Sequence, residues 1–480
     1  MKIALISPSI KQSASANYPD GIPRSISQNF GVYPWLGLCY LAGVLEKTGF
    51  DSEIIDMDAE SFRVSDVIKR LFEIKPSLVG ISTISFTFIF ALQLAQEIKK
   101  HFDIPVIFGG NHVSIYPKEV VMHDAIDIGV VGEGEETFLK LVSTFQEYGR
   151  NFLGHLKEID GLVFKKDGET ITTNPRKFIK DIDRLPFPAV HKLRINRYYG
   201  CNQVKPYVTM VTARGCPFSC SFCSKEPWGD TFRFHSAERV VDEIEYYIKN
   251  LGIRAIDFYD DTFTVPRSRT IAITNLIKRR NIKFDFGLMT RIDCVDEELL
   301  FKLKEAGCKF LAYGVESGDR KVQGKVNKVF NNEDIAAAFR ISKKAGIRTV
   351  GFFMIGYPEE TQEEIDNTIK LMKGLDADYM KTNIFIPYPG SQLYNQLLST
   401  QKLRTDFWLE LTKGKIPPIR ELIKTKVSIS RLVKLRNYMN RLPYLRLRGS
   451  NFLKINKIKS FEDIKRSLAI MLGSCCDRKI

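Results

Sequence analysis

The sequence predicts an α/β protein in which a doubly wound parallel sheet precedes a partial (β/α)6 TIM-like barrel and a basic helical C-terminal region. Short apolar strands alternate with amphipathic helices over the first 140 residues, and the same alternation begins again at Tyr207. The length of 480 residues also exceeds what one hydrophobic core accommodates. We expect domains at 1–145 and 205–395, a linker with a small hairpin at 146–204, and the basic region at 396–480.

The first series has the pattern of a sheet with helices on both faces. Its expected strands are residues 2–7, 51–57, 78–83, 105–108 and 127–131, and its expected helices are 36–49, 64–74 and 88–102. Ligands of such sheets bind where the strands end. We therefore expect Ser82, Gly109–His112 and Gly132–Glu135 at the functional edge. In the linker, Asp167-Gly168 predicts a hairpin turn.

The second series predicts barrel units. Its expected strands are residues 207–213, 254–259, 284–290, 309–315, 348–355 and 380–386, with helices at 237–250 and 295–306 among the connections. Ala306-Gly307 and Ala345-Gly346 each end a helix just before a strand, as repeated barrel units do. Six such units form an open version of the eightfold barrel, whose chemistry lies at the carboxyl ends of the strands.

The amino-terminal residues and the cysteine pattern both bear on the cellular location of the protein. The amino-terminal residues lack the apolar core of a signal peptide, and nine cysteines with one tight cluster do not resemble a disulfide framework. A cytoplasmic location is expected. The uncharged stretch from Ser77 to Ala95 is near the length of a membrane span, but its polar residues favour a buried strand leading into a helix.

The positive charge is concentrated at one end of the chain. Residues 411–480 hold 18 Lys and Arg against four acids, so nearly all of the net charge of +15 lies there. A solvated helical cap is one interpretation. Peripheral contact with an anionic membrane, or with an acidic or lipid-like substrate, is another. Nucleic-acid binding is disfavoured because the rest of the chain is neutral and no stacking platform is evident.

Three cysteines follow the first strand of the second series within eight residues: Cys216, Cys220 and Cys223. Thiolates at this spacing can converge on a soft metal site, and a Gly-Cys-Pro entry favours a loop. Structural zinc would need a fourth ligand such as His235, and an electron-transfer cluster usually has four cysteines. A cubane held by three cysteines leaves one iron open for substrate chemistry.

The C-x3-C-x2-C spacing, with Phe222 before the last cysteine, resembles the signature of radical S-adenosylmethionine (SAM) enzymes. The resemblance spans roughly residues 205–395. It implies that Cys216, Cys220 and Cys223 bind a 4Fe–4S cluster. The methionyl amino and carboxylate groups of SAM would bind the fourth iron, and reductive cleavage of SAM would give a 5′-deoxyadenosyl radical. A reductant such as flavodoxin or ferredoxin would supply the electron.

Further segments match this family at successive strand ends. The resemblance implies that Asp260 and Asp261 lie near the methionyl amine, where a carboxylate can accept hydrogen bonds from an ammonium. It also implies that Glu316, with Ser317, accepts from the ribose hydroxyls and that Arg291 faces a carboxylate. The segments Gly351–Thr361 and Ile386–Gly390 resemble the parts that flank adenine.

The first 140 residues resemble the cobalamin-binding domain found in a large subgroup of this family. The matching segments are Tyr33–Gly37, Ser82–Ile84, Gly109–His112 and Val131–Glu135. Gly109 and Gly110 would let the backbone approach a nucleotide tail closely, and Ser82 would hydrogen-bond it. Many such domains present a histidine to cobalt from the loop after the first strand. Here the chain has no histidine before His101, so we expect cobalamin to bind without that ligand, and His112 to be a structural residue at the edge of the sheet. The alternative is a domain that has lost cobalamin.

These resemblances predict a cobalamin-dependent radical SAM enzyme. Its simplest activity is methyl transfer to an unactivated carbon of a small-molecule or lipid-like substrate. The same pair of domains also serves ring closure and rearrangement, so a cyclase is the alternative. A non-catalytic iron–sulfur electron-transfer protein is the alternative from another class.

Overall fold

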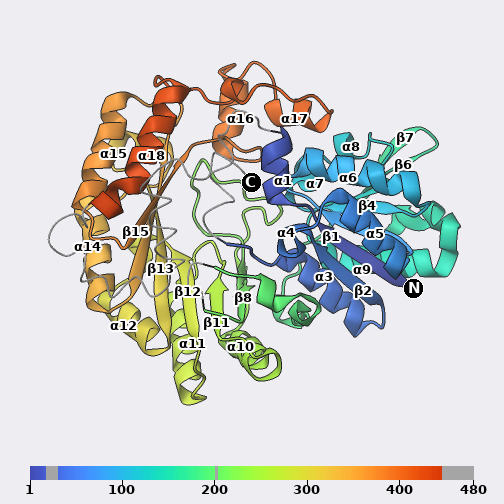
Figure 1. Ribbon diagram of the computed structural model, residues 1–480, viewed down its shortest axis with the longest axis horizontal. Coiled ribbons are helices and arrows are strands. Elements are labelled where there is room, and N and C mark those ends of the chain that lie inside the picture. Colours follow the sequence, from blue (N-terminus) through green and yellow to red (C-terminus); the bar gives the residue numbers. More distant parts are fainter. Residues whose placement is uncertain (18–30, 201–203, 446–480) are drawn as a thin grey trace. The chain divides into compact units, whose positions relative to one another are not determined.

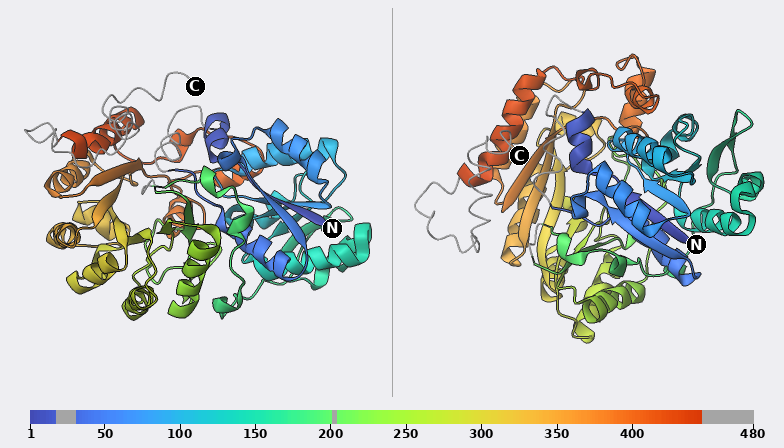
Figure 2. Two further views of the ribbon diagram at one scale, coloured as in Figure 1. Left: turned by 60° about the horizontal axis from the view of Figure 1, so that its bottom comes forward. Right: turned by 45° about the vertical axis from the view of Figure 1, so that its right-hand side comes forward.

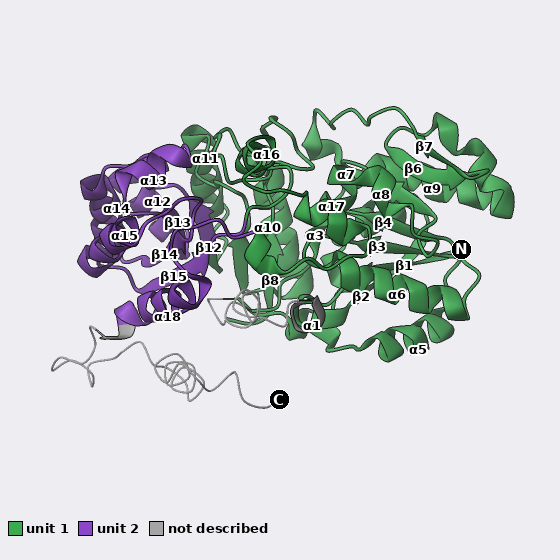
Figure 3. Ribbon diagram, turned by 90° about the horizontal axis from the view of Figure 1, so that it is seen from above, with its two compact units in different colours: residues 1–286, 387–421 green, residues 287–386, 422–480 purple. Residues whose placement is uncertain are grey.

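The computed structural model describes residues 1–17, 31–200 and 204–445. The chain divides into two compact units, shown in different colours in Figure 3. Unit 1 comprises residues 1–286 and 387–421, and unit 2 comprises residues 287–386 and the chain from Leu422 onward. The predicted domain boundaries at 145, 204 and 395 remain a proposal.

Unit 1 begins with a seven-stranded sheet of order β2-β1-β3-β4-β5-β6-β7, called the N-terminal sheet (Figure 1). Its strands are β1 (Lys2–Ser7), β2 (Asp51–Asp56), β3 (Leu78–Ser82), β4 (Val106–Gly109), β5 (Ile128–Val130), β6 (Leu162–Lys166) and β7 (Glu169–Thr172). Strands β1 to β5 are parallel, as expected. The β6–β7 hairpin turns at Asp167 and pairs antiparallel with β5, so it extends the sheet.

Helices cover both faces of the N-terminal sheet (Figure 2). Ile3 and Leu5 of β1 pack in a core with α3 and α9, while the alternate residues Ala4 and Ile6 are equally buried. Because neighbouring side chains of a strand point to opposite faces, both faces must be covered. The main helices are α1 (Ile10–Asn17), α3 (Leu36–Lys47), α5 (Val64–Ile74), α6 (Phe88–His101) and α9 (Gly134–Tyr148). The sequence did not predict α1 or α9.

The next part of unit 1 contains the first two barrel strands, β8 (Tyr207–Met210) and β11 (Ala255–Phe258), which are parallel neighbours. The expected strand over 207–213 is wrong in its second half. The chain leaves the barrel after β8, and β9 (Ala213–Arg214) pairs antiparallel with β10 (Arg233–Phe234). Helices α10 (Ala237–Leu251) and α11 (Arg267–Arg279) follow β10 and β11.

Unit 2 continues the barrel with parallel strands and helices on one side of them (Figure 1). The strands are β12 (Asp285–Thr290, begun in unit 1), β13 (Cys308–Glu316), β14 (Arg348–Ile355) and β15 (Tyr379–Ile384). The helices between them are α12 (Glu297–Glu305), α13 (Arg320–Lys325), α14 (Asn332–Lys344) and α15 (Gln362–Gly374). The six barrel strands follow chain order in one sheet, which confirms the partial barrel.

The region after the barrel is helical as far as it is described. Helices α16 (Gln392–Ser399) and α17 (Phe407–Thr412) belong to unit 1, and α18 (Ile429–Leu445) belongs to unit 2. Residues 446–480, which carry much of the predicted basic region, lie outside the described residues. The uncharged stretch 77–95 forms β3 and most of α6. Among the described residues, every helix is too short or too polar to cross a bilayer.

Helix α18 protects the free edge of β15. The side chain of Asn440 accepts a hydrogen bond from the Thr382 backbone N–H at 2.6 Å and donates to the Thr382 carbonyl at 3.3 Å. One amide side chain therefore takes the place that a neighbouring strand would fill. Last strands of open sheets need such cover because unpaired backbone groups are costly when buried.

Replacing Asn440 with alanine is expected to loosen β15, because both Thr382 backbone groups lose their partner. The local free energy of opening should fall by about 1–3 kcal/mol. Hydrogen–deuterium exchange of peptides that contain Thr382 measures this, with Asn437→Ala as control because Asn437 is exposed and bonds only to Arg436. Equal exchange in the two variants would contradict the prediction.

Candidate active site

The three cysteines lie in a loop of residues 215–232, the cysteine loop, which the β9–β10 pair closes at its base. Gly215 has φ +82°, and a Cβ there would lie 2.0 Å from the Thr231 carbonyl oxygen. Only glycine therefore fits beside Cys216. Cys216 and Cys220 are half-buried and Cys223 is exposed.

Three thiolates of one loop make up the expected donor set of a 4Fe–4S cluster. Within the described residues, no three His, Cys, Asp or Glu side chains are arranged around one metal ion. A cubane takes its cysteine ligands on different irons, so its thiolates need not meet at one point. His235, the fourth ligand weighed for zinc, is 2% exposed and bonds Asp183 through Nδ1 at 2.9 Å.

Two buried glutamates hold the base of the cysteine loop. Arg214 donates to Glu133 Oε1 at 2.7 Å and also to Glu135. Arg233, at the other end of the loop, donates to both oxygens of Glu133 at 2.9 and 3.0 Å. Glu133 and Glu135 therefore follow β5 as expected, and both are bonded beneath the cysteine loop.

Asp260 is also turned toward this base. Its Oδ1 accepts from the backbone N–H groups of Thr212 and Ala213 at 2.6 and 2.7 Å, and its Oδ2 accepts from the Thr212 hydroxyl at 2.6 Å. Burial raises its pKa. These three donors give Asp260 a structural role, and its expected contact with the SAM amine stays a prediction.

Asp261 is better placed for a ligand. Its side chain is solvent-accessible, yet desolvation by the surrounding protein, and then the Asp260 charge, raise its pKa to about 6. The neighbouring Thr262 hydroxyl lies 3.7 Å from Cys216 Sγ, which connects the end of β11 with the cysteine loop. Phe222 is half-buried within the loop.

Two further segments hold the cysteine loop from outside. Asn111, which follows β4, donates to the Glu226 carbonyl at 2.9 Å. At the start of α16, the Leu393 N–H donates to the Ser221 carbonyl at 2.8 Å, and Ser391 forms a β-bridge with Ser224. These contacts were not predicted.

Two glycines at the carboxyl edge of the N-terminal sheet, Gly109 and Gly110, lie in different surroundings. Gly110 has φ +100°, and a Cβ there would lie 2.4 Å from the Thr83 carbonyl oxygen, so internal packing requires glycine. A Cβ on Gly109 would meet only the Val130 Cβ at 3.9 Å, which leaves open space above the strand end. Ser82 is half-buried there, and the buried Ser7 hydroxyl at the end of β1 has no hydrogen-bond partner among the described residues. This edge can accept a nucleotide tail.

His112 is a structural residue. It is fully buried, with Nδ1 at 3.0 Å from the Ser85 hydroxyl and Nε2 at 3.0 Å from the Thr412 hydroxyl. Burial lowers its pKa to about 3, so the ring is neutral. Both nitrogens are engaged, which agrees with the expectation that His112 does not replace the missing cobalt ligand. The loop after β1, from which many cobalamin-binding domains present a histidine, includes residues 18–30. These residues lie outside the described part of the chain.

The expected SAM-facing residues of unit 2 already have protein partners. Glu316 pairs with Lys328 at 2.8 Å and has φ +70°. Ser317 is fully buried and bonds the Thr368 hydroxyl at 3.0 Å. Their roles toward SAM stay predictions, and a ribose would share Glu316 with Lys328.

Arg291 also has a carboxylate of its own chain. Its guanidinium donates to both oxygens of Asp293 at 2.8 and 2.7 Å and lies over the Phe330 ring. In this bidentate pair, Asp293 occupies the two guanidinium N–H donors that a cofactor carboxylate would otherwise bind. The contact between Arg291 and a cofactor carboxylate therefore stays a prediction, and it requires Arg291 to release Asp293.

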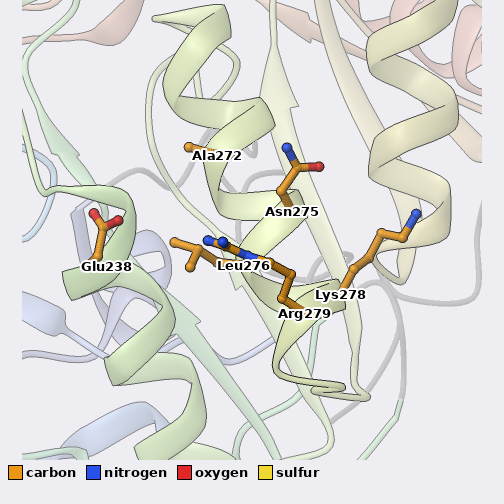
Figure 4. A pocket seen from close by; sticks show the side chains of 6 residues that line it. All are labelled: Glu238, Ala272, Asn275, Leu276, Lys278 and Arg279. Carbon is orange, nitrogen blue, oxygen red and sulfur yellow. The ribbon is translucent and has the colours of Figure 1, made fainter.

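One surface pocket lies elsewhere in unit 1 (Figure 4). It is formed by outward side chains of α10 and α11, and no expected site residue lines it. The lining residues are Glu238, Ala272, Asn275, Leu276, Lys278 and Arg279.

Comparison with known proteins agrees with the two-part pattern. The profile of the radical SAM superfamily matches residues 210–372, and that of the B12 binding domain matches residues 29–142. The chain belongs to the radical SAM enzymes that carry a B12-binding domain. Membership of this enzyme family sets aside the non-catalytic electron-transfer alternative.

Particular relatives name two kinds of activity. The chain is 34% identical over 406 residues to the uncharacterized methyltransferase PH0819 of Pyrococcus horikoshii, covering 84% of this chain and 86% of that protein. It is 30% identical over 376 residues to the anaerobic magnesium-protoporphyrin IX monomethyl ester cyclase of Rubrivivax gelatinosus, covering 76% of this chain and 67% of that protein.

A solved structure shows the same fold. The radical SAM methyltransferase TsrM of Kitasatospora setae, with cobalamin and a [4Fe–4S] cluster bound, superposes with a TM-score of 0.64 at 20% identity. The match covers 82% of this chain and 75% of that chain.

Alanine substitutions at Gly109 and Gly110 should have different effects on stability and on cobalamin binding. Gly110→Ala is expected to lower the free energy of unfolding by about 1–3 kcal/mol because of its positive φ and the contact with Thr83. Gly109→Ala should leave stability unchanged and weaken hydroxocobalamin binding. Thermal unfolding and the corrinoid absorbance spectrum measure the two effects. Unchanged hydroxocobalamin affinity in Gly109→Ala would remove Gly109 from the proposed contact.

The two adjacent aspartates should also differ. Asp260→Ala leaves three buried donors unpaired, at about 1–3 kcal/mol each, and is expected to lose iron. Asp261→Asn should keep its iron and bind SAM about tenfold more weakly, since it loses a charge-assisted hydrogen bond. Iron content and equilibrium dialysis of SAM test this pair. Asp261 is not a SAM ligand if its variant binds SAM as the wild type does.

Proposed function

We propose that this chain is a cobalamin-dependent methyltransferase of the radical SAM family, acting at an unactivated carbon of a small-molecule or lipid-like substrate. The observation that carries the proposal is the match to the methyltransferase of Pyrococcus horikoshii, which covers most of both chains. When bound, the cofactors supply a carbon-centred radical and a transferable methyl group.

The proposed cluster ligands are Cys216, Cys220 and Cys223, with Phe222 beside them. The position of all three cysteines in one loop whose base is closed by β9 and β10 supports this assignment. The electron would come from a reductant such as flavodoxin or ferredoxin.

For SAM, we propose Asp261 at the amine and Glu316 at the ribose. The accessible carboxyl of Asp261 can accept from an ammonium, and Glu316 can exchange part of its bond with Lys328 for a hydroxyl. Ser317 supports the backbone beside Glu316 through Thr368, and Arg291 would orient a carboxylate after release from Asp293.

For cobalamin, we propose that the edge formed by Ser82, Gly109 and Gly110 receives the nucleotide tail, with no histidine on the cobalt. The open space above Gly109 and the engaged ring of His112 support this. Peripheral contact of residues 411–480 with an anionic membrane also remains a proposal.

Ring closure or rearrangement is the second candidate, because the cyclase of Rubrivivax gelatinosus matches at 30% identity. The two candidates differ in what they do with SAM. Methyl transfer releases S-adenosylhomocysteine, whereas a cyclase releases 5′-deoxyadenosine alone.

Anaerobic incubation of reconstituted protein with SAM, hydroxocobalamin and a reductant is expected to give both products. Cys216→Ala should abolish 5′-deoxyadenosine and retain S-adenosylhomocysteine, because only the former needs the cluster. Cys294→Ser serves as the control, since Cys294 lies outside the cysteine loop. Liquid chromatography with mass spectrometry measures both nucleosides. Formation of 5′-deoxyadenosine without S-adenosylhomocysteine would favour the cyclase.

A further inference from the structure

One glutamate of the N-terminal sheet binds both ends of the cysteine loop. Glu133, which precedes α9, accepts from Arg214 at the entry of the loop and from Arg233 at its exit. Its other contact is the Ile179 N–H, which donates to Oε2 at 2.7 Å. Arg233 in turn donates to the Ile179 carbonyl at 2.7 Å. A single carboxylate thus bonds both ends of the loop, beside the β9–β10 pair that closes its base.

These charges lie in a nearly dry environment. The side chains of Glu133 and Arg214 are 1% and 4% exposed, and those of Glu135 and Arg233 are 8% and 11% exposed. Two cations and two anions make the group neutral. Charges buried to this degree act strongly on their surroundings because water does not screen them.

The cysteine loop itself completes the enclosure of Arg214. The guanidinium lies over the ring of Trp228, a loop residue, at 5.0 Å and over Tyr40 of α3 at 5.2 Å. Arg214 is two residues before Cys216. The Glu133 contacts therefore hold the backbone two residues before the first cysteine.

We propose that Glu133 is a positioning residue for the iron–sulfur cluster, setting the conformation of the cysteine loop and the electrostatic balance beside it. The inference rests on the proposed function, because it needs the cluster to be held by Cys216, Cys220 and Cys223. It assigns the Gly132–Glu135 segment of the B12-binding region to the support of the neighbouring cofactor.

The charge balance has a consequence with a definite sign. Glu133→Gln keeps the shape of the side chain but leaves one positive charge in excess. Reduction adds an electron to the cluster, so an excess positive charge favours the reduced form and shifts the reduction potential in the positive direction. Arg233→Gln leaves one negative charge in excess and shifts the potential in the negative direction.

The experiment compares full-length, anaerobically reconstituted variants: Glu133→Gln, Arg233→Gln, the double variant, and Glu136→Gln as matched control. Glu136 is on the same helix with its side chain 56% exposed. Electron paramagnetic resonance at a series of fixed potentials reports the reduction potential of the cluster. We expect shifts of opposite sign in the two single variants, and a potential near that of the wild type in the double variant and the control.

Several results would contradict the proposed role of Glu133. Shifts of the same sign, or no shift, would overturn it, because a general loss of packing cannot produce opposite signs. If Glu133→Gln loses iron, the neutral double variant is expected to regain it, and failure to do so also counts against the proposal. Absence of a 4Fe–4S signal in the wild-type protein would instead contradict the proposed function.

Discussion

The guanidinium of Arg214 lies beneath the cysteine loop, paired with two carboxylates that stand about 80 residues earlier in the chain. Burying a cation without such partners is costly, so the loop base and the segment before α9 must be placed together for either to be stable. Asp260 adds a second constraint, because it turns the chain out of β8 into β9. The loop that carries the three thiols depends on both carboxylate groups.

The segment after the barrel strengthens this arrangement in unit 1. Tyr116 and Tyr394 both donate to Asp406, and His112 bonds Thr412. These contacts explain why a stretch beyond residue 387 belongs to the same compact unit as the N-terminal sheet. They also account for the role of His112, because its two ring nitrogens bond the hydroxyls of Ser85 and Thr412 and are not available as a cobalt ligand.

In unit 2 the expected cofactor residues are satisfied by their own chain. Glu316 bonds Lys328, and Arg291 bonds Asp293 through both donors. Pairing of this kind holds polar side chains in fixed positions before a ligand arrives. It also means that a cofactor must offer a hydrogen bond at least as good as the one that it replaces.

Much of the architecture was determined by the sequence itself. Strand and helix periodicity located most barrel strands within a few residues, and the spacing of three cysteines indicated the family, because both signals are short-range. The tertiary structure alone decided which polar residues are free to act. The sequence placed Asp260, Asp261 and Glu133 alike at strand ends where ligands are expected, yet packing buries Asp260 and Glu133 and leaves Asp261 accessible. The physical reason is that a carboxylate's role is set by the donors that reach it, and here those donors come from residues roughly 50 to 100 positions away.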